Sequence, residues 1–220
     1  MPLFSRILKS VAAACIVASQ VSLAQAQTAS AAAGSKEKNI LVIGDSLSAE
    51  YGIARDSGWV NILRQRLAKE YPDYSVINAS ISGDTSSGGA ARAPAAIDRH
   101  KPAIMILELG GNDALRGLSL AAAEKNLSGI VEKARQAGAR TLLVGMMIPP
   151  NFGRKYADEF KNMFVSVSKA HETELVPFFF EGIALNDTYF LPDGIHPNED
   201  AQQKLFDNVW PTLEPMLKAR

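Results

Sequence analysis

Short apolar runs alternate with longer amphipathic segments along most of this chain. Five runs have the length and the β-branched, leucine-rich composition of buried strands: 39–43, 74–78, 103–109, 141–148 and 174–179. Helical spacing of apolar positions is found at 57–70, 90–99, 119–137, 154–172 and 199–217. This alternation predicts a parallel sheet with helices on both faces. We therefore expect a five-stranded, flavodoxin-like, three-layer α/β/α sandwich.

The N-terminal residues have the pattern of a secretory signal peptide. Arg6 and Lys9 precede an apolar, alanine-rich stretch at 11–24, and Ala24-Gln25-Ala26 supplies small residues for cleavage. A retained membrane anchor is the weaker alternative, because the apolar stretch is short for a bilayer span. We predict a periplasmic protein with three parts: a signal peptide at 1–26, a flexible lead-in at 27–38 and one domain at 39–220.

Composition excludes several classes of function. The only cysteine among the 220 residues, Cys15, lies inside the predicted signal peptide, so the mature chain would have neither a disulfide nor a thiol nucleophile. Lipidation of Cys15 is disfavoured because the apolar run continues beyond it. Removing residues 1–26 changes the net charge from 0 to −2, and no basic stripe of the kind that binds nucleic acid is present.

Polar, glycine-containing motifs follow the predicted strands or lie near the last helix. They are Gly44-Asp45-Ser46, Ser82-Gly83-Asp84, Gly110-Gly111-Asn112-Asp113 and Asp193-Gly194-Ile195-His196. Parallel strands deliver their loops to one edge of the sheet, so we expect these groups to meet there. Acyl transfer requires a hydroxyl nucleophile, a base, an orienting carboxylate and donors for an oxyanion, and this set contains each of them.

The four motifs, in this order, resemble the four sequence blocks of the SGNH (GDSL) hydrolases. Ser46, Gly83, Asn112 and His196 match the four family residues, and Asp193 matches the aspartate three residues before the histidine. The resemblance covers about 40–197 and is strongest to the bacterial periplasmic acyl-CoA thioesterase I, lysophospholipase and arylesterase group. A single Gly-Asp-Ser would be a weak signal, whereas four blocks in order are specific.

The resemblance implies a role for each matched residue. Ser46 would attack the acyl carbon, His196 would act as base and then as acid, and Asp193 would orient His196. The backbone N–H groups of Ser46 and Gly83 and the side-chain amide of Asn112 would form the oxyanion hole. These roles require neither a cofactor nor a metal. We expect a monomer that acts on small acyl esters or thioesters, with no nucleic-acid partner and no stable membrane anchor.

Apolar residues near the motifs are candidates for binding the acyl chain. These are Leu47, Leu115, Ile148, Pro149 and Phe152, although such residues could equally be ordinary core. An apolar site favours fatty-acyl, aryl or lysophospholipid esters and thioesters. A carbohydrate acetylesterase of the same family and a non-catalytic periplasmic binding module are the alternatives.

Three individual residues carry alternative interpretations from sequence. Ser46 could cap a helix, as serines often do, and His196 could be a plain helix-entry residue before a proline. Glu50 stands where the first family block often has glycine, which suggests a charge at the rim of the site. The aspartates at 45, 84 and 113 are expected to hydrogen-bond their own loops.

Overall fold

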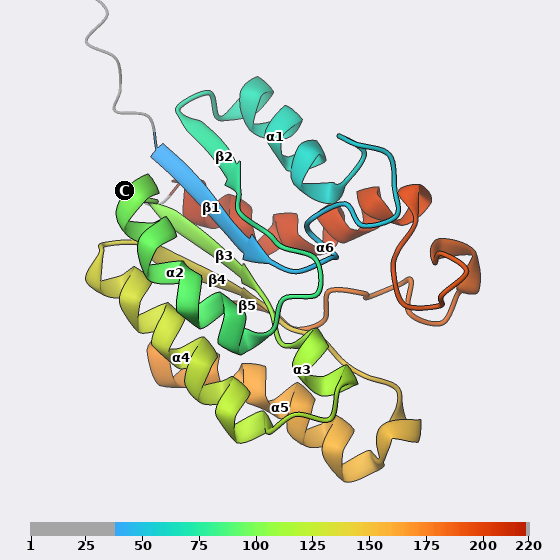
Figure 1. The fold of residues 1–220 in the computed structure, drawn as a ribbon. Helices are drawn as coiled ribbons and strands as arrows, with labels where there is room; N and C mark the ends of the chain where they lie inside the picture. The colour runs from blue at the N-terminus through green and yellow to red at the C-terminus, as the bar shows by residue number, and fades with distance from the viewer. Residues whose placement is uncertain (1–37, 219–220) are drawn as a thin grey trace, which may run out of the picture. The chain divides into compact units, whose positions relative to one another are not determined.

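The computed structural model describes residues 38–218, which form a five-stranded sheet whose strands are all parallel (Figure 1). The strands are β1 (Lys38–Gly44), β2 (Tyr74–Asn78), β3 (Ile104–Glu108), β4 (Arg140–Val144) and β5 (Glu174–Val176). Their order is β2-β1-β3-β4-β5, which is the flavodoxin-like order. The predicted signal peptide lies outside the described residues, and β1 begins at Lys38, one residue before the predicted strand.

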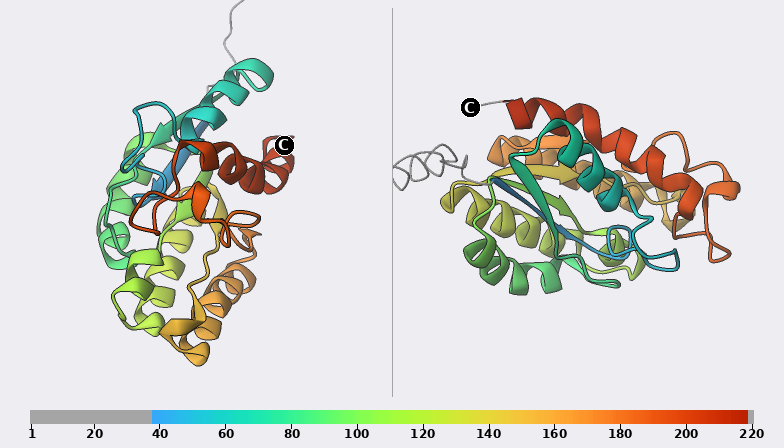
Figure 2. Two further views of the ribbon diagram at one scale, coloured as in Figure 1. Left: turned by 90° about the vertical axis from the view of Figure 1, so that its right-hand side faces the viewer. Right: turned by 90° about the horizontal axis from the view of Figure 1, so that it is seen from above.

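Helices cover both faces of this sheet. They are α1 (Trp59–Glu70), α2 (Ser86–His100), α3 (Gly111–Leu115), α4 (Leu120–Gln136), α5 (Arg154–His171) and α6 (Glu199–Lys218), with 3-10 turns η1 (Pro150–Phe152) and η2 (Asp187–Tyr189). Figure 2 shows α1 and α6 on one face and α2, α4 and α5 on the other. The predicted three-layer sandwich is therefore confirmed. No helix between residues 38 and 218 has the length and apolar character to cross a membrane.

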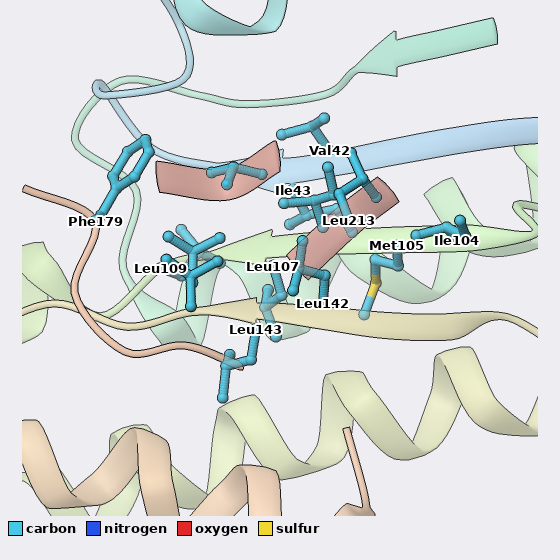
Figure 3. Packing of buried hydrophobic residues seen from close by; sticks show 14 of the residues in the cluster. Val42, Ile43, Ile104, Met105, Leu107, Leu109, Leu142, Leu143, Phe179 and Leu213 are labelled. Atoms are coloured by element: carbon cyan, nitrogen blue, oxygen red, sulfur yellow. The ribbon is translucent and has the colours of Figure 1, made fainter. Parts of the chain in front are cut away.

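The core forms where the strands are buried on both faces. All five residues of β3 are buried, and Ile40 to Ile43 of β1 have no exposed surface. Figure 3 shows side chains of β1, β3 and β4 packed together with Leu213 of α6. Burying one such side chain contributes about 1.5–3 kcal/mol, so the sheet forms a firm base for the loops at its edge.

The last two strands are shorter than their apolar runs predict. We expected them to extend to 148 and 179, but β4 ends at Val144 and β5 at Val176. Pro177 has no N–H to continue the ladder. The N–H of Gly145 donates to the carbonyl of Val176 at 2.7 Å, and a Cβ on Gly145 would lie 2.6 Å from the carbonyl oxygen of Pro177. The carbonyl of Gly145 still accepts from Phe179 N at 2.9 Å, but the regular ladder of β4 and β5 has ended.

Helix α2 begins at Ser86 rather than at residue 90. Its start is fixed by side chains: Thr85 accepts a hydrogen bond from Gly88 N at 3.2 Å, and Asp113 accepts from both N and Oγ of Ser86 at 2.7 Å. A Cβ on Gly89 would lie 2.2 Å from Leu109 Cδ1, so the glycine permits close packing. The early start of α2 therefore depends on contacts with Asp113 and Leu109, which the local sequence does not show.

Candidate active site

Ser46 lies in the turn that follows β1. The backbone N–H of Ala49 donates to the carbonyl of Asp45 at 3.0 Å, and that of Tyr51 donates to the carbonyl of Ser46 at 3.3 Å. Helix α1 starts only at Trp59, with Gly58 as its N-cap residue, so the interpretation of Ser46 as the cap of that helix is wrong. The serine is 9% exposed and its hydroxyl faces His196.

Three side chains form a hydrogen-bonded row at this edge of the sheet. His196 Nε2 lies 2.9 Å from Ser46 Oγ, and His196 Nδ1 lies 2.7 Å from Asp193 Oδ2. The other oxygen of Asp193 accepts from the backbone N–H groups of Ile195 and His196 at 2.9 and 3.0 Å. His196 does precede α6, as expected of a helix-entry residue, but both of its ring nitrogens lie within hydrogen-bond distance of Ser46 and Asp193.

The environment of Asp193 keeps its carboxylate ionised. Burial alone would raise the pKa of Asp193, but the N–H groups of His196 and Ile195 and the imidazole of His196 outweigh it and hold the pKa at about 2. The tight turn that delivers these donors uses Gly194 at a φ of +66°. The carboxylate is therefore an acceptor for the His196 ring over the whole physiological range of pH.

Tyr51 contacts the same histidine from another direction. Its ring centroid lies 4.4 Å from that of His196, with an angle of 40° between the planes, and half of the tyrosine is exposed. The ring therefore covers one side of the imidazole. The sequence motifs did not assign Tyr51 to the site.

Gly83 and Asn112 lie beside this row. Gly83 follows β2 and has a φ of +78°, which favours glycine. Asn112 is on α3, a short helix absent from the predicted elements, which starts after Gly110 at a φ of +113°. Asn112 Nδ2 donates to Asp45 Oδ2 at 3.0 Å, directly next to Ser46. Asn112 is thus linked to the residue before Ser46, and Gly83 is linked to Asn112 through Arg116.

Arg116 is a neighbour that the sequence did not single out. Its Nη2 donates to the carbonyl oxygen of Gly83 at 2.9 Å and lies 3.3 Å from Asn112 Oδ1. The side chain is exposed and reaches back from the end of α3. The only sequence signal for a contact between Arg116 and Asn112 was their spacing of four residues, which is one helical turn.

The buried carboxyl groups of Glu108 and Asp45 hydrogen-bond to the turn that carries Ser46. Glu108 Oε2 accepts from Ser48 Oγ at 2.8 Å and from the backbone N–H of Asp45 at 3.3 Å, while Trp59 Nε1 donates to Ser48 Oγ at 3.2 Å. Burial and the neighbouring charge of Asp45 raise the pKa of Glu108 well above its usual range. Burial also raises the pKa of Asp45 to about 6, although Leu47 N and Asn112 donate to it. Sequence reasoning missed Glu108 because it ends an apolar strand.

The expectation that the loop aspartates hydrogen-bond their own loops is confirmed for Asp45 and Asp84, which accept from Leu47 N at 3.1 Å and from Thr85 N at 3.0 Å. For the side chain of Asp113 the expectation is wrong, and all three carboxylates also bind residues outside their own loops. Asp45 also binds Asn112, and Asp113 binds Ser86 at the start of α2. Asp84 accepts from its neighbour Thr85 N at 3.0 Å but also from Arg92 Nε at 2.7 Å. These carboxylates therefore join separate loops at the sheet edge.

The residues predicted for acyl binding fall into different environments. Ile148 is buried, Leu47 is half-buried and Pro149 is exposed. Leu115 and Phe152 are 39% and 43% exposed, and they follow β3 and β4 at the carboxyl edge. Helix α5 joins this region, because the hydroxyl of Tyr156 donates to the carbonyl of Leu118 at 3.2 Å. Further exposed apolar side chains on the same edge are Ile81, Leu118 and Ile195.

Glu50 stabilises a loop rather than presenting a free charge. Its two carboxylate oxygens accept from Gly58 N at 2.8 Å and from Asp56 N at 2.9 Å. Its backbone has a φ of +59°, which explains why a glycine suits this position. Where the family block often has glycine, this chain therefore has a glutamate that adopts the same left-handed backbone and accepts two hydrogen bonds.

The fold and the site together define a class. A serine hydroxyl, an imidazole and a carboxylate in hydrogen-bonded order, with glycine and asparagine beside them at the carboxyl edge of this sheet, are the features of an SGNH-type hydrolase. Residues 42–204 match the model of the GDSL-like Lipase/Acylhydrolase family, and the chain belongs to that family.

Named relatives lie within this family. Esterase TesA of Pseudomonas aeruginosa is 49% identical over 180 residues, which cover 82% of this chain and 90% of that protein. Thioesterase 1/protease 1/lysophospholipase L1 of Escherichia coli K12 is 39% identical over 178 residues, covering 81% and 84%. The chain is accordingly an enzyme of the SGNH esterase and thioesterase type.

Solved structures agree with this assignment. The crystal structure of TesA matches with a TM-score of 0.80 at 49% identity and covers 81% of this chain and 99% of that one. The psychrotrophic esterase EstA of Pseudoalteromonas sp., inhibited by monoethylphosphonate, matches with a TM-score of 0.78 at 36% identity, covering 83% and 100%. The predicted fold class and family are confirmed.

Proposed function

We propose that this enzyme hydrolyses acyl esters and thioesters through a Ser46-His196-Asp193 triad and a covalent acyl-enzyme. One observation carries the proposal: the unbroken row in which Asp193 Oδ2 lies 2.7 Å from His196 Nδ1 and His196 Nε2 lies 2.9 Å from Ser46 Oγ. These distances lie within hydrogen-bond reach, as nucleophile activation requires.

In the proposed acylation step, Ser46 Oγ attacks the carbonyl carbon of the substrate while His196 Nε2 takes the hydroxyl proton. The carbonyl oxygen becomes an oxyanion, which accepts hydrogen bonds from the N–H groups of Ser46 and Gly83 and from the amide of Asn112. The tetrahedral intermediate collapses and breaks the bond to the leaving group. The alkoxide or thiolate leaves with the proton from His196, and Ser46 holds the acyl group.

Deacylation repeats these steps with water as nucleophile. His196 takes a proton from water as the oxygen attacks the acyl carbon, and a second oxyanion forms in the same hole. Collapse returns the proton to Ser46 Oγ and releases the carboxylic acid. Asp193 stays ionised throughout, because its role is to fix the ring tautomer and to stabilise the imidazolium.

We propose fatty-acyl, aryl or lysophospholipid-type esters and thioesters as the substrate class. The exposed apolar side chains of Leu115 and Phe152 at the edge that carries Ser46 support this choice, since a long acyl chain needs an apolar surface. The names of the relatives, which include an arylesterase from Vibrio mimicus, point in the same direction. We also propose that the enzyme is a monomer and has no nucleic-acid partner.

We further propose that the enzyme works in the periplasm after removal of residues 1–26. The order of Arg6 and Lys9, the apolar stretch and Ala24-Gln25-Ala26 supports export. An intact mass that corresponds to a native chain beginning near Gln27 would agree with this proposal. A mass that includes Met1, or a lipid on Cys15, would contradict it.

A fluorophosphonate probe and a panel of substrates test the enzyme proposal. The wild-type protein should be labelled at Ser46, and Ser46→Ala should not; a binding module would remain unlabelled in both forms. Rates on p-nitrophenyl esters and acyl-CoA thioesters of rising chain length then separate the alternatives. An optimum at acetate with a steep fall would favour a carbohydrate acetylesterase, and higher kcat/KM for longer chains would favour the proposed substrate class.

A further inference from the structure

The side-chain amide of Asn112 is held at both of its ends. Its Nδ2 donates to Asp45 Oδ2 at 3.0 Å, and its Oδ1 lies 3.3 Å from Arg116 Nη2, which can only donate. The mechanism proposed above uses the Asn112 amide but assigns no role to either partner. Asp45 is 2% exposed, whereas Arg116 is exposed.

We propose that Asp45 and Arg116 are positioning residues that orient the Asn112 amide toward the oxyanion. This inference rests on the proposed function, because it concerns one of the three donors of the proposed oxyanion hole. Neither residue touches the reacting atoms. Each acts through Asn112, and Arg116 acts through Gly83 as well.

The two contacts select one of the two orientations of the amide. In the observed orientation the carboxylate of Asp45 faces an N–H and the guanidinium of Arg116 faces the carbonyl oxygen. Rotating the amide by 180° would set two acceptors against each other at Asp45 and two donors against each other at Arg116. With one N–H bound to Asp45, the second N–H of Asn112 stays available for the oxyanion.

Arg116 also connects two donors of the hole. The same Nη2 atom donates to the carbonyl oxygen of Gly83 at 2.9 Å, and a Cβ on Gly83 would lie 3.6 Å from this atom. Gly83 has a φ of +78°, so its peptide groups have access to conformations closed to other residues. The guanidinium therefore fixes the Gly83 loop relative to the Asn112 amide.

Only a carboxylate at position 45 satisfies both of its partners. Asp45 Oδ1 accepts from Leu47 N at 3.1 Å, and Oδ2 accepts from Asn112. An asparagine has a single acceptor oxygen, so it could serve Leu47 N but would present its NH₂ group to the NH₂ group of Asn112. A buried charge near Glu108 is unfavourable in itself, which argues that the second acceptor has a functional use.

Asp45→Asn and Arg116→Ala test the inference, each with a matched control. Asp113→Asn also changes a buried aspartate, one that binds Ser86 and has no hydrogen bond to the Asn112 side chain among the described residues. Arg135→Ala changes an exposed arginine of α4 that pairs with Glu132. The readouts are kcat, KM, Tm and the inhibition constant of an alkyl trifluoromethyl ketone, which forms an oxyanion on Ser46.

We expect Asp45→Asn to lower kcat by about 10–100-fold with KM within about twofold, which is less than the loss of an oxyanion donor itself. Inhibition by the trifluoromethyl ketone should weaken by a similar factor. Arg116→Ala should lower kcat about 3–10-fold, since its contact with Asn112 is longer and exposed. Asp113→Asn should lower Tm without a selective loss of kcat, and Arg135→Ala should change none of the four readouts.

The outcomes separate the inference from the proposed function. If Asp45→Asn and Arg116→Ala keep kcat and inhibitor affinity within twofold, the positioning role is wrong while the triad stands. A loss in Asp45→Asn that Asp113→Asn reproduces in every readout also overturns the role of Asp45. Should Asp45→Asn fail to fold, the exposed Arg116→Ala decides alone. Full activity in Ser46→Ala would instead overturn the proposed function and this inference with it.

Discussion

The Nε2 atom of His196 lies 2.9 Å from the Oγ atom of Ser46, although 150 residues separate the two in the chain. Ser46 follows the first strand of the sheet and His196 precedes the last helix. They meet because β1 ends next to the other parallel strands, at the edge where the closing loop returns to α6 (Figure 1). This pair makes the nucleophile the first residue to test.

Ser46→Ala should remove about 10⁴-fold or more of kcat, as loss of the nucleophile does in other serine triads. The fold should survive, since the change deletes one hydroxyl from a turn. Steady-state rates and circular dichroism on the same preparation check both points. Ordinary activity in a folded Ser46→Ala enzyme would refute the triad.

Asn112→Ala should lower kcat by about 10²–10³-fold with little change in KM, because the amide acts on charge that develops in the transition state. Asn112→Asp should be at least as harmful, since a carboxylate there would face both the oxyanion and Asp45. Kinetics and thermal unfolding of both variants give the answer. A lower Tm together with equal effects on kcat and KM would mean that Asn112 only holds the turn after β3.

Glu50→Gly and Glu50→Ala should differ in stability although both lose the same carboxylate. Each loses the hydrogen bonds from Asp56 N and Gly58 N, but only glycine relieves the φ of +59°. Left-handed backbone costs an L-residue roughly 1–2 kcal/mol, so Glu50→Gly should be about 1 kcal/mol more stable than Glu50→Ala. Urea unfolding measures this difference. Equal stabilities of the two variants would contradict backbone strain at Glu50. A shift in substrate preference in both variants would support a role for the Glu50 charge at the rim of the site.

Asp45 should make stability depend on pH in a defined direction. Its pKa is raised from 3.8 to about 6, so between these values the folded protein holds a proton that the unfolded chain has released. Its contribution to stability is thus present at low pH and is lost as pH rises through about 6. The charged groups that face it are Glu108 and Asp84, together with the imidazole of His196.

Asp45→Asn lacks this titration, so its stability relative to wild type should increase between pH 4 and pH 7. Denaturant unfolding of both proteins at pH 4, 5, 6 and 7 measures the difference. Parallel stability curves over that range would contradict the raised pKa of Asp45.

Phe152→Ala should reduce kcat/KM for long acyl chains more than for acetate. A buried methylene contributes about 0.8 kcal/mol, so losing contact with two methylenes would lower kcat/KM for an octanoate about tenfold. Leu185→Ala is a suitable control because Leu185 is fully exposed and lies between β5 and η2. Equal effects of Phe152→Ala on acetate and octanoate would remove Phe152 from acyl binding.

Some elements were predictable because their signals are local. The strand at 74–78 matches β2 at both ends, and Gly138 follows α4 at a φ of +83°, as the pattern of a glycine after a helix predicts. The helices around 154 and 199 were predicted with their starts correct, because their apolar spacing continues over several turns. Periodicity fails where a contact from elsewhere decides, as at Ser86, whose helical start depends on Asp113.

The sequence by itself determined the strand and helix alternation and the family, and it predicted Ser46, Gly83, Asn112, Asp193 and His196 as site residues, because motif spacing and strand ends are local features. Only the tertiary structure decided how they are supported. Asp45 belongs to the first motif, but the sequence does not show the distant partners of Asp45, Glu108 or Arg116. Their roles arise from hydrogen bonds across 67, 63 and 33 residues. Such contacts depend on how close separate loops come at the sheet edge, a distance that packing sets and that no local pattern contains.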